Sequence, residues 1–90
     1  MNWFKEWIAS QAFKKFAKLT VDAIKLFLGK IGKDVWEIVK KRVQDAELTD
    51  LKGKQKAEWV FNKVKTDLGT IEVKEKYIRY LIEAGAILFS

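Results

Sequence analysis

The chain has 90 residues, of which 49% are hydrophobic and 13% aromatic, and this composition is too apolar for a disordered chain and suits one small folded domain. It contains no cysteine and no histidine, which excludes disulfides, thiolate metal sites and the commonest general base and metal ligand. The net charge of +6 lies entirely in residues 1–44, with ten basic and four acidic residues, because residues 45–90 hold eight of each.

The first predicted element is a helix over about residues 10–28. Placed at 100° intervals around a helix, its polar residues share one narrow strip, and these are Gln11, Lys14, Lys15, Lys18, Asp22 and Lys25. The apolar arc that remains is much wider than the roughly 100° stripe that a surface helix needs. We therefore expect this helix to lie between two helices, to pack in an oligomer or to enter a membrane interface.

The residues before this helix do not follow the same phase. Phe4 and Trp7 project over the lysine strip, so we expect the helix to bend near Ala9 or to start there, with Ser10 as its N-cap. An aromatic cluster would then stand apart from the helix, and it comprises Trp3, Phe4, Trp7 and Ile8. This cluster is a candidate anchor for a membrane or partner, unless it packs onto the rest of the domain.

Glycines divide the rest of the chain into three further predicted helices. The second covers residues 34–47 with Asp34 as N-cap, and its basic cluster Lys40, Lys41 and Arg42 also suits the negative end of the helix dipole. The third covers residues 52–68 and ends at Gly69; its Trp59 points away from the apolar face and needs cover from the first segment or from a partner. The fourth covers residues 73–89, where Gly85 would allow a neighbouring helix to approach closely.

These elements predict an all-α fold, a compact up-and-down bundle of about four helices in a single domain over residues 1–90. Residues 1–30 form a basic amphipathic N-terminal segment and residues 31–90 a helical core, in which the last three helices are able to form a three-helix unit. The longest uncharged runs are seven residues, so we expect no membrane-spanning helix and no secretory signal. The absence of cysteine favours an intracellular protein.

The sequence does not favour catalysis. A catalytic triad or a zinc site needs residues that are missing, and residues 28–33 (LGKIGK) lack the spacing and the Lys-Ser/Thr pair of a phosphate-binding loop. We therefore expect no enzyme activity, no cofactor, no metal and no small-molecule substrate.

Three stretches within residues 43–89 form a recognisable pattern, and they are residues 53–60 (GKQKAEWV), 68–69 (LG) and 77–86 (YIRYLIEAGA). Through these stretches, residues 43–89 resemble the soluble C-terminal region of the LLH family of phage holins. The resemblance implies a phage-encoded, membrane-associated protein that helps to lyse the host by permeabilising the inner membrane for a cell-wall hydrolase. Family members have an N-terminal transmembrane helix, whereas this chain has the basic amphipathic residues 3–28 in its place, which suits surface association at the cytoplasmic face of the host membrane.

Three functions follow as hypotheses. The first is holin-like binding to an anionic membrane surface through residues 1–30, and the second is a soluble module that forms a homo-oligomer or binds a protein partner. The third, less favoured, is non-specific binding to nucleic acid. The candidate membrane- or partner-binding residues are Trp3, Phe4, Trp7, Ile8, Phe13, Phe16, Phe27 and Trp59. The candidate basic patch is Lys14, Lys15, Lys18, Lys25, Lys30, Lys33, Lys40, Lys41 and Arg42.

Overall fold

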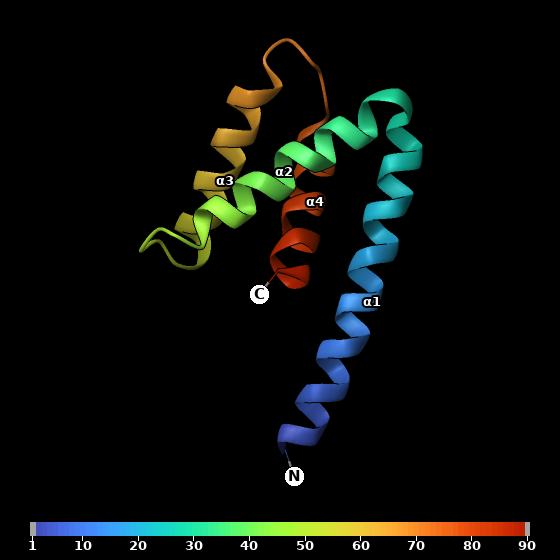
Figure 1. The fold of residues 1–90 in the computed structure, drawn as a ribbon, viewed down its shortest axis with the longest axis vertical. Helices are drawn as coiled ribbons and strands as arrows, with labels where there is room; N and C mark the ends of the chain where they lie inside the picture. Colours follow the sequence, from blue (N-terminus) through green and yellow to red (C-terminus); the bar gives the residue numbers. More distant parts are fainter. Residues whose placement is uncertain (1, 90) are drawn as a thin grey trace.

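The computed structural model describes the backbone of residues 2–89 and the side chains of residues 14–89. Helix α1 spans Asn2–Leu28, a 3-10 turn η1 spans Gly29–Ile31, and α2 spans Gly32–Ala46. Helix α3 spans Gly53–Leu68 and α4 spans Glu75–Leu88. The helices run alternately up and down, with α1 beside α4 and α2 crossing between α1 and α3 (Figure 1). The predicted all-α bundle is therefore confirmed.

The sequence predicted about four helices, whereas the described chain has three uninterrupted helical stretches, because α1, η1 and α2 follow one another without a loop. Gly29 makes the bend with a φ of 68°, a left-handed conformation that favours glycine. At Gly32, a Cβ atom would collide with the backbone of Lys25, so only glycine allows the chain to fold back this tightly. The first two predicted helices are thus one long helix with a sharp corner.

Two predicted helix starts are wrong. Helix α1 already begins at Asn2 and continues through Ser10, which is therefore not an N-cap. Helix α2 begins at Gly32, directly after the 3-10 turn, so Asp34 lies in the first turn and not at the cap. A carboxylate in that turn still faces the positive end of the helix dipole.

The hydrophobic core receives side chains from all four labelled helices. Helix α1 contributes Ala17, Val21 and Ile24, so it belongs to the same core as the other helices. The largest fully buried side chains are Leu81, Val35, Val39 and Val64. Helix α4 crosses close to α2 at Gly85, where an added Cβ would lie 3.3 Å from Cγ2 of Val43. The predicted close approach at this glycine is confirmed.

Helix α1 contacts α2 and α4, whereas α3 contacts α2 and α4, and within the described residues α1 and α3 do not meet. The N-terminal half of α1 extends past the end of α4 (Figure 1), which accounts for the long dimension of a molecule measuring 49 × 31 × 17 Å. Much of the circumference of α1 is consequently left without a neighbour.

Candidate functional site

The side of α1 that faces away from the core carries large apolar side chains. Phe16 is 70% exposed, Leu19 63%, Leu26 84% and Phe27 69%. Together with the exposed Ala23, these residues form what we call the outward face. At 100° per residue they occupy an arc of about 100°, nearly opposite the arc that holds the buried residues of the helix. One helix therefore has two apolar faces, of which only one is covered.

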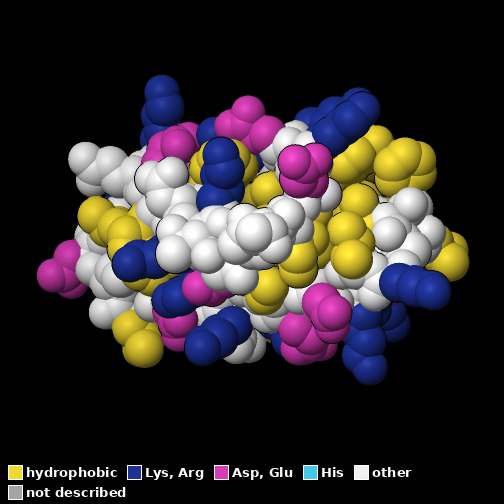
Figure 2. Space-filling view, turned by 90° about the horizontal axis from the view of Figure 1, so that it is seen from above, with side chains coloured by type: hydrophobic (Ala, Val, Ile, Leu, Met, Phe, Trp, Pro, Cys, Tyr) yellow, Lys and Arg dark blue, Asp and Glu magenta, His cyan; other side chains and the backbone are white. Residues whose placement is uncertain are grey.

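The outward face continues onto α4 through aromatic contact. The rings of Phe27 and Tyr77 lie 5.1 Å apart between centroids and are tilted by 45°. One turn further along α4, Tyr80 is 51% exposed. Figure 2, which looks down on the view of Figure 1, shows hydrophobic side chains gathered toward the side where α1 lies. Apolar surface of this kind, when contiguous, is typical of a protein or membrane contact.

Lysines border the outward face along one edge. Lys15 and Lys18 are exposed, whereas Lys14 and Lys25 are half-buried at the side that turns toward the core. None of the four, nor Lys30 or Lys33 in the corner region, has an ion-pair partner among the side chains that the structure describes. Their charge is therefore available to an anionic partner.

The rest of the predicted basic patch is arranged differently. Of the three cations Lys40, Lys41 and Arg42 on α2, Lys40 pairs with Glu37 at 3.0 Å, and Lys41 alone is exposed without an ion pair among the described side chains. Arg42 donates two hydrogen bonds to Asp67 on α3, from Nε to Oδ2 at 2.6 Å and from Nη2 to Oδ1 at 2.8 Å. Two of these three cations thus bind carboxylates of the chain itself.

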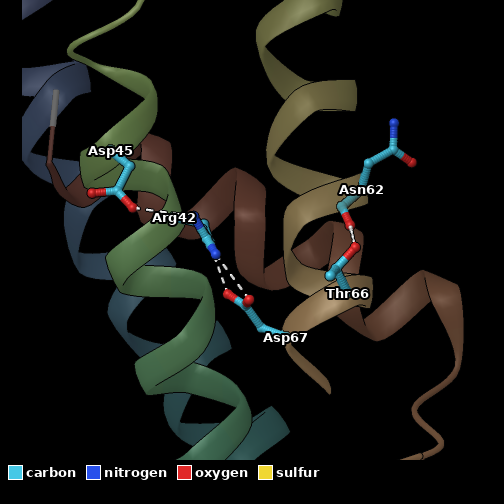
Figure 3. A network of polar contacts seen from close by, with 5 residues as sticks. All are labelled: Arg42, Asp45, Asn62, Thr66 and Asp67. Carbon is cyan, nitrogen blue, oxygen red and sulfur yellow. Dashed lines mark hydrogen bonds and ion pairs between the residues drawn. The ribbon is translucent and has the colours of Figure 1, made fainter. Parts of the chain in front are cut away.

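Figure 3 shows how the guanidinium of Arg42 bridges α2 and α3. Asp45, one turn along α2, lies 3.5 Å from Nη1 and completes the arrangement. The hydrogen bonds from Arg42 lower the pKa of Asp67, and the same bonds raise the pKa of Arg42. Nearby, the hydroxyl of Thr66 donates to the carbonyl of Asn62 on the same helix. This network joins two helices and leaves Arg42 unsuited to bind an external phosphate.

Arg79 has a similar structural role between α3 and α4. It pairs with Glu75 four residues earlier on α4 and with Glu58 on α3, in both cases at 3.0 Å. Its guanidinium also lies 4.2 Å from the ring centroid of Phe61. The hydrogen bonds that Arg79 donates to Glu58 and, with a smaller effect, to Glu75 raise the pKa of Arg79. The charges of the second half of the chain therefore hold the bundle together.

Trp59 is half-buried at the margin of the core, with Nζ of Lys63 5.7 Å from its ring centroid. Helix α1 does not cover it, because α1 and α3 are not in contact over the described residues. Trp59 is consequently remote from Phe16 and Phe27. The remaining predicted contact residues lie outside the described side chains, and they are Trp3, Phe4, Trp7, Ile8 and Phe13.

Sequence reasoning did not single out Leu19, Leu26 and Tyr80 as contact residues. Leu19 and Leu26 were detectable in principle, because they lie on the side of the helix opposite Val21 and Ile24. Nothing in the sequence states which side α4 covers, so the two apolar sides were equivalent before the fold was known. Tyr80 follows from its position one turn after Tyr77, once Tyr77 is placed beside Phe27.

A cavity of ≈ 540 Å³ opens between α2, α3 and α4. Its lining includes the apolar Val43, Val60 and Ile82, and the ion pair between Lys56 and Glu47, at 3.0 Å, stands at its rim. No buried polar side-chain atom among the described residues lacks a partner, so the cavity holds no buried polar group to orient a small molecule, and Glu83 in its lining is exposed.

Over the described residues, no cluster of acidic side chains is suited to hold a metal ion. In the same part of the chain, no helix combines the length and the apolar character needed to cross a membrane. Comparisons of the chain with protein-family models, with curated proteins and with solved structures found no match. The surfaces of the protein therefore remain as the guide to its function.

Proposed function

We propose that the protein is a non-enzymatic, membrane-associated protein that binds an anionic membrane surface through the outward face of α1. One observation carries the proposal: Phe16, Leu19, Leu26 and Phe27 are all more than 60% exposed on one side of a helix, and the lysines at its neighbouring edge have no ion pair among the described side chains. An interfacial helix has this arrangement, because its apolar side enters the acyl boundary while its lysines stay among the headgroups.

Burial of apolar side chains and attraction between lysines and anionic lipid both contribute to binding, and their relative sizes determine how binding should respond to salt. Burying one leucine or phenylalanine side chain contributes about 1.5–3 kcal/mol, whereas one lysine near an anionic surface contributes about 1 kcal/mol. Four large side chains on the outward face therefore outweigh the two exposed lysines, Lys15 and Lys18. We expect binding that persists at moderate salt, with the lysines selecting anionic over neutral lipid.

The holin-like part of the proposal rests on the resemblance of residues 43–89. In this interpretation α1 takes the place of the transmembrane helix of that family, and the protein lies on the cytoplasmic face of the host membrane during phage lysis. Its other three helices would act as a folded head, held together by the ion pairs of Arg42 and Arg79.

Nucleic-acid binding is a weaker candidate for a physical reason. Of the nine predicted basic-patch residues, Lys40 and Arg42 are held by carboxylates of the chain. Arginine makes the bidentate contacts that phosphate recognition favours, and Arg42, the single arginine of the patch, is already engaged with Asp67. An apolar outward face also has no use in phosphate contact.

Vesicle co-sedimentation tests the proposal directly. We expect the chain to bind vesicles that contain phosphatidylglycerol and to bind pure phosphatidylcholine vesicles weakly. The double variant Leu19→Ser/Leu26→Ser should bind the anionic vesicles about 100-fold more weakly, because two apolar side chains are removed from the contact. The matched control is Leu48→Ser/Ile71→Ser, which removes two exposed apolar side chains from the loops.

Circular dichroism should show the same helical content for both double variants, since all four side chains are exposed. Equal vesicle binding by the wild type and Leu19→Ser/Leu26→Ser would exclude the outward face as the binding surface. Deleting α1 is a poorer test, because the deletion would also remove Ala17, Val21 and Ile24 from the core.

A further inference from the structure

The outward face has a spacing that suits contact with another helix. Phe16, Leu19, Ala23 and Leu26 follow one another at intervals of three, four and three residues. Such a 3-4 pattern places side chains along one seam of a helix and allows them to interlock with a second helix of the same pattern. The core-facing residues of α1 lie on the other side, so the seam is free for a second helix.

We propose that, away from the membrane, two copies of this chain pair through their outward faces, with the two α1 helices antiparallel and the two-fold axis passing between residues 17 and 18. This inference rests on the proposed function in one respect: it names what covers the face when lipid does not. In this arrangement Phe16 of each copy packs against Leu19 of the other. Ala23 and Leu26 lie further along the same seam, opposite the helix backbone at residues 12 and 9 of the second copy, whose side chains lie outside the described part of the chain.

Charge complementarity selects this register. Lys15 and Asp22 are both exposed, and both border the seam on the same edge, two turns apart. Neither has an ion-pair partner among the described side chains. In the proposed dimer, Lys15 of each copy lies beside Asp22 of the other, and the two-fold axis produces this pair twice.

The other ways to align the same seam are less favourable. An antiparallel pairing shifted to an axis at residue 21 would place Asp22 beside Asp22 of the second copy, with like charges opposed. A parallel pairing would place Asp22 beside the apolar Phe27 of the second copy and leave Lys15 beside Thr20. Only the first register joins opposite charges on both sides of the axis.

The shape of the protomer accommodates this dimer. The N-terminal half of α1 extends beyond α4 (Figure 1), so a second α1 can lie along the helix without meeting the rest of the bundle there. The dimer and the lipid surface would use the same side chains, Phe16, Leu19 and Leu26, and would therefore compete. Dimerisation thus keeps the apolar face covered in water and makes membrane binding depend on dimer dissociation.

Sedimentation velocity of the full chain without lipid measures the dimer. We expect a reversible monomer–dimer equilibrium in the wild type. Asp22→Lys should raise the dimer dissociation constant by at least about tenfold, because two attractive pairs become two repulsive ones. The charge swap Lys15→Asp/Asp22→Lys should restore the wild-type constant, because the pairs are re-formed with reversed sign.

The control for charge alone is Glu72→Lys, which makes the same change of +2 at an exposed loop residue away from α1 and should leave the dimer unchanged. A monomeric wild type at concentrations of about 100 μM would overturn the inference, since specific protein contacts are usually populated there. An unaffected dimer in Asp22→Lys, or a swap that does not restore it, would also overturn the proposed register.

Vesicle binding by the same variants separates this inference from the proposed function. Asp22→Lys should bind anionic vesicles more tightly than the wild type, because it adds positive charge and releases the monomer. A dimer that behaves as expected but never binds vesicles would support the inference and contradict the proposed function. Vesicle binding by a chain that stays monomeric would support the function and contradict the inference.

Discussion

Helix α1 and the helices α2 to α4 differ in how their side chains are used. Among the described residues, four of the seven large exposed hydrophobic side chains lie on α1 and none lies on α2 or α3. Conversely, all six ion pairs between described side chains join residues between 37 and 79, and none of the described lysines of α1 takes part. Helices α2 to α4 therefore pair part of their charge among themselves, whereas the described part of α1 leaves both its charge and an apolar surface open.

This difference indicates which residues serve stability and which serve contact. A single exposed leucine is ordinary in a folded protein and needs no explanation. A continuous seam of exposed phenylalanine and leucine on one helix is not ordinary, because contact of apolar side chains with water is unfavourable and the folded state does not require it. Selection for folding explains α2 to α4, and the outward face of α1 requires a partner.

The largest effect that separates the two regions should come from one pair of matched substitutions. Leu81→Ala removes a fully buried side chain from α4 and should lower the free energy of unfolding by about 3 kcal/mol. Leu26→Ala removes the same atoms from a side chain that is 84% exposed and should change it by less than about 0.5 kcal/mol. Urea denaturation followed by circular dichroism measures both.

Similar losses in the two variants would mean that Leu26 is buried in solution, as in a tight dimer. The urea experiment should therefore be repeated at several protein concentrations. The free energy of unfolding of a dimer rises with protein concentration. If it rises less for Leu26→Ala than for the wild type, Leu26 contributes to dimer formation and not to the core of the protomer.

Lysines with and without an ion pair should contribute differently to vesicle binding, and this second difference between the two regions is expected to be smaller. Lys18→Gln/Lys30→Gln removes two exposed lysines that have no ion pair with any described side chain, and it should weaken binding to anionic vesicles about 30-fold at low salt. Lys40→Gln/Lys56→Gln makes the same change of net charge at lysines paired with Glu37 and Glu47, and should weaken it by less than about threefold. Equal effects would indicate that net charge alone, and not the position of the lysines, controls binding.

Local pattern was sufficient to predict part of the fold. The third predicted helix, residues 52–68, agrees with α3 to within one residue, because its apolar spacing is regular and Gly69 ends it. The contact at Gly85 was also predictable, because a glycine inside a helix is costly unless a neighbour approaches closely. Both features depend on residues a few positions apart, where the sequence is most informative.

Features that depend on distant residues were not predictable. The start of α2 at Gly32 depends on how closely the corner packs against Lys25, and local capping rules favoured Asp34 instead. The pair of Arg42 with Asp67 joins residues 25 apart, beyond any helical spacing rule. For the same reason, the width of the apolar arc on α1 was visible in the sequence, but the half that α4 covers was not.

The smallest predicted effect concerns the Arg42–Asp67 ion pair, which joins α2 to α3. Because the hydrogen bonds from Arg42 lower the pKa of Asp67 in the folded protein, the carboxylate is stabilised relative to the unfolded chain. That stability is fully present above the unfolded pKa of about 3.9 and is lost as the pH falls through the lowered folded value. Asp67→Asn should therefore lower the melting temperature by up to about 4 °C at pH 7 and by less below about pH 4.

Thermal denaturation of the wild type and Asp67→Asn at pH 7 and at about pH 2.5 measures how far the difference between their melting temperatures decreases in acid. Glu72→Gln removes an exposed carboxylate that has no ion pair among the described side chains, and its melting temperature should follow the wild type at both pH values. If the difference in melting temperature between the wild type and Asp67→Asn increased in acid, the ion pair of Arg42 with Asp67 would not stabilise the fold. The Arg42–Asp67 pair would then no longer distinguish α2 to α4 from α1.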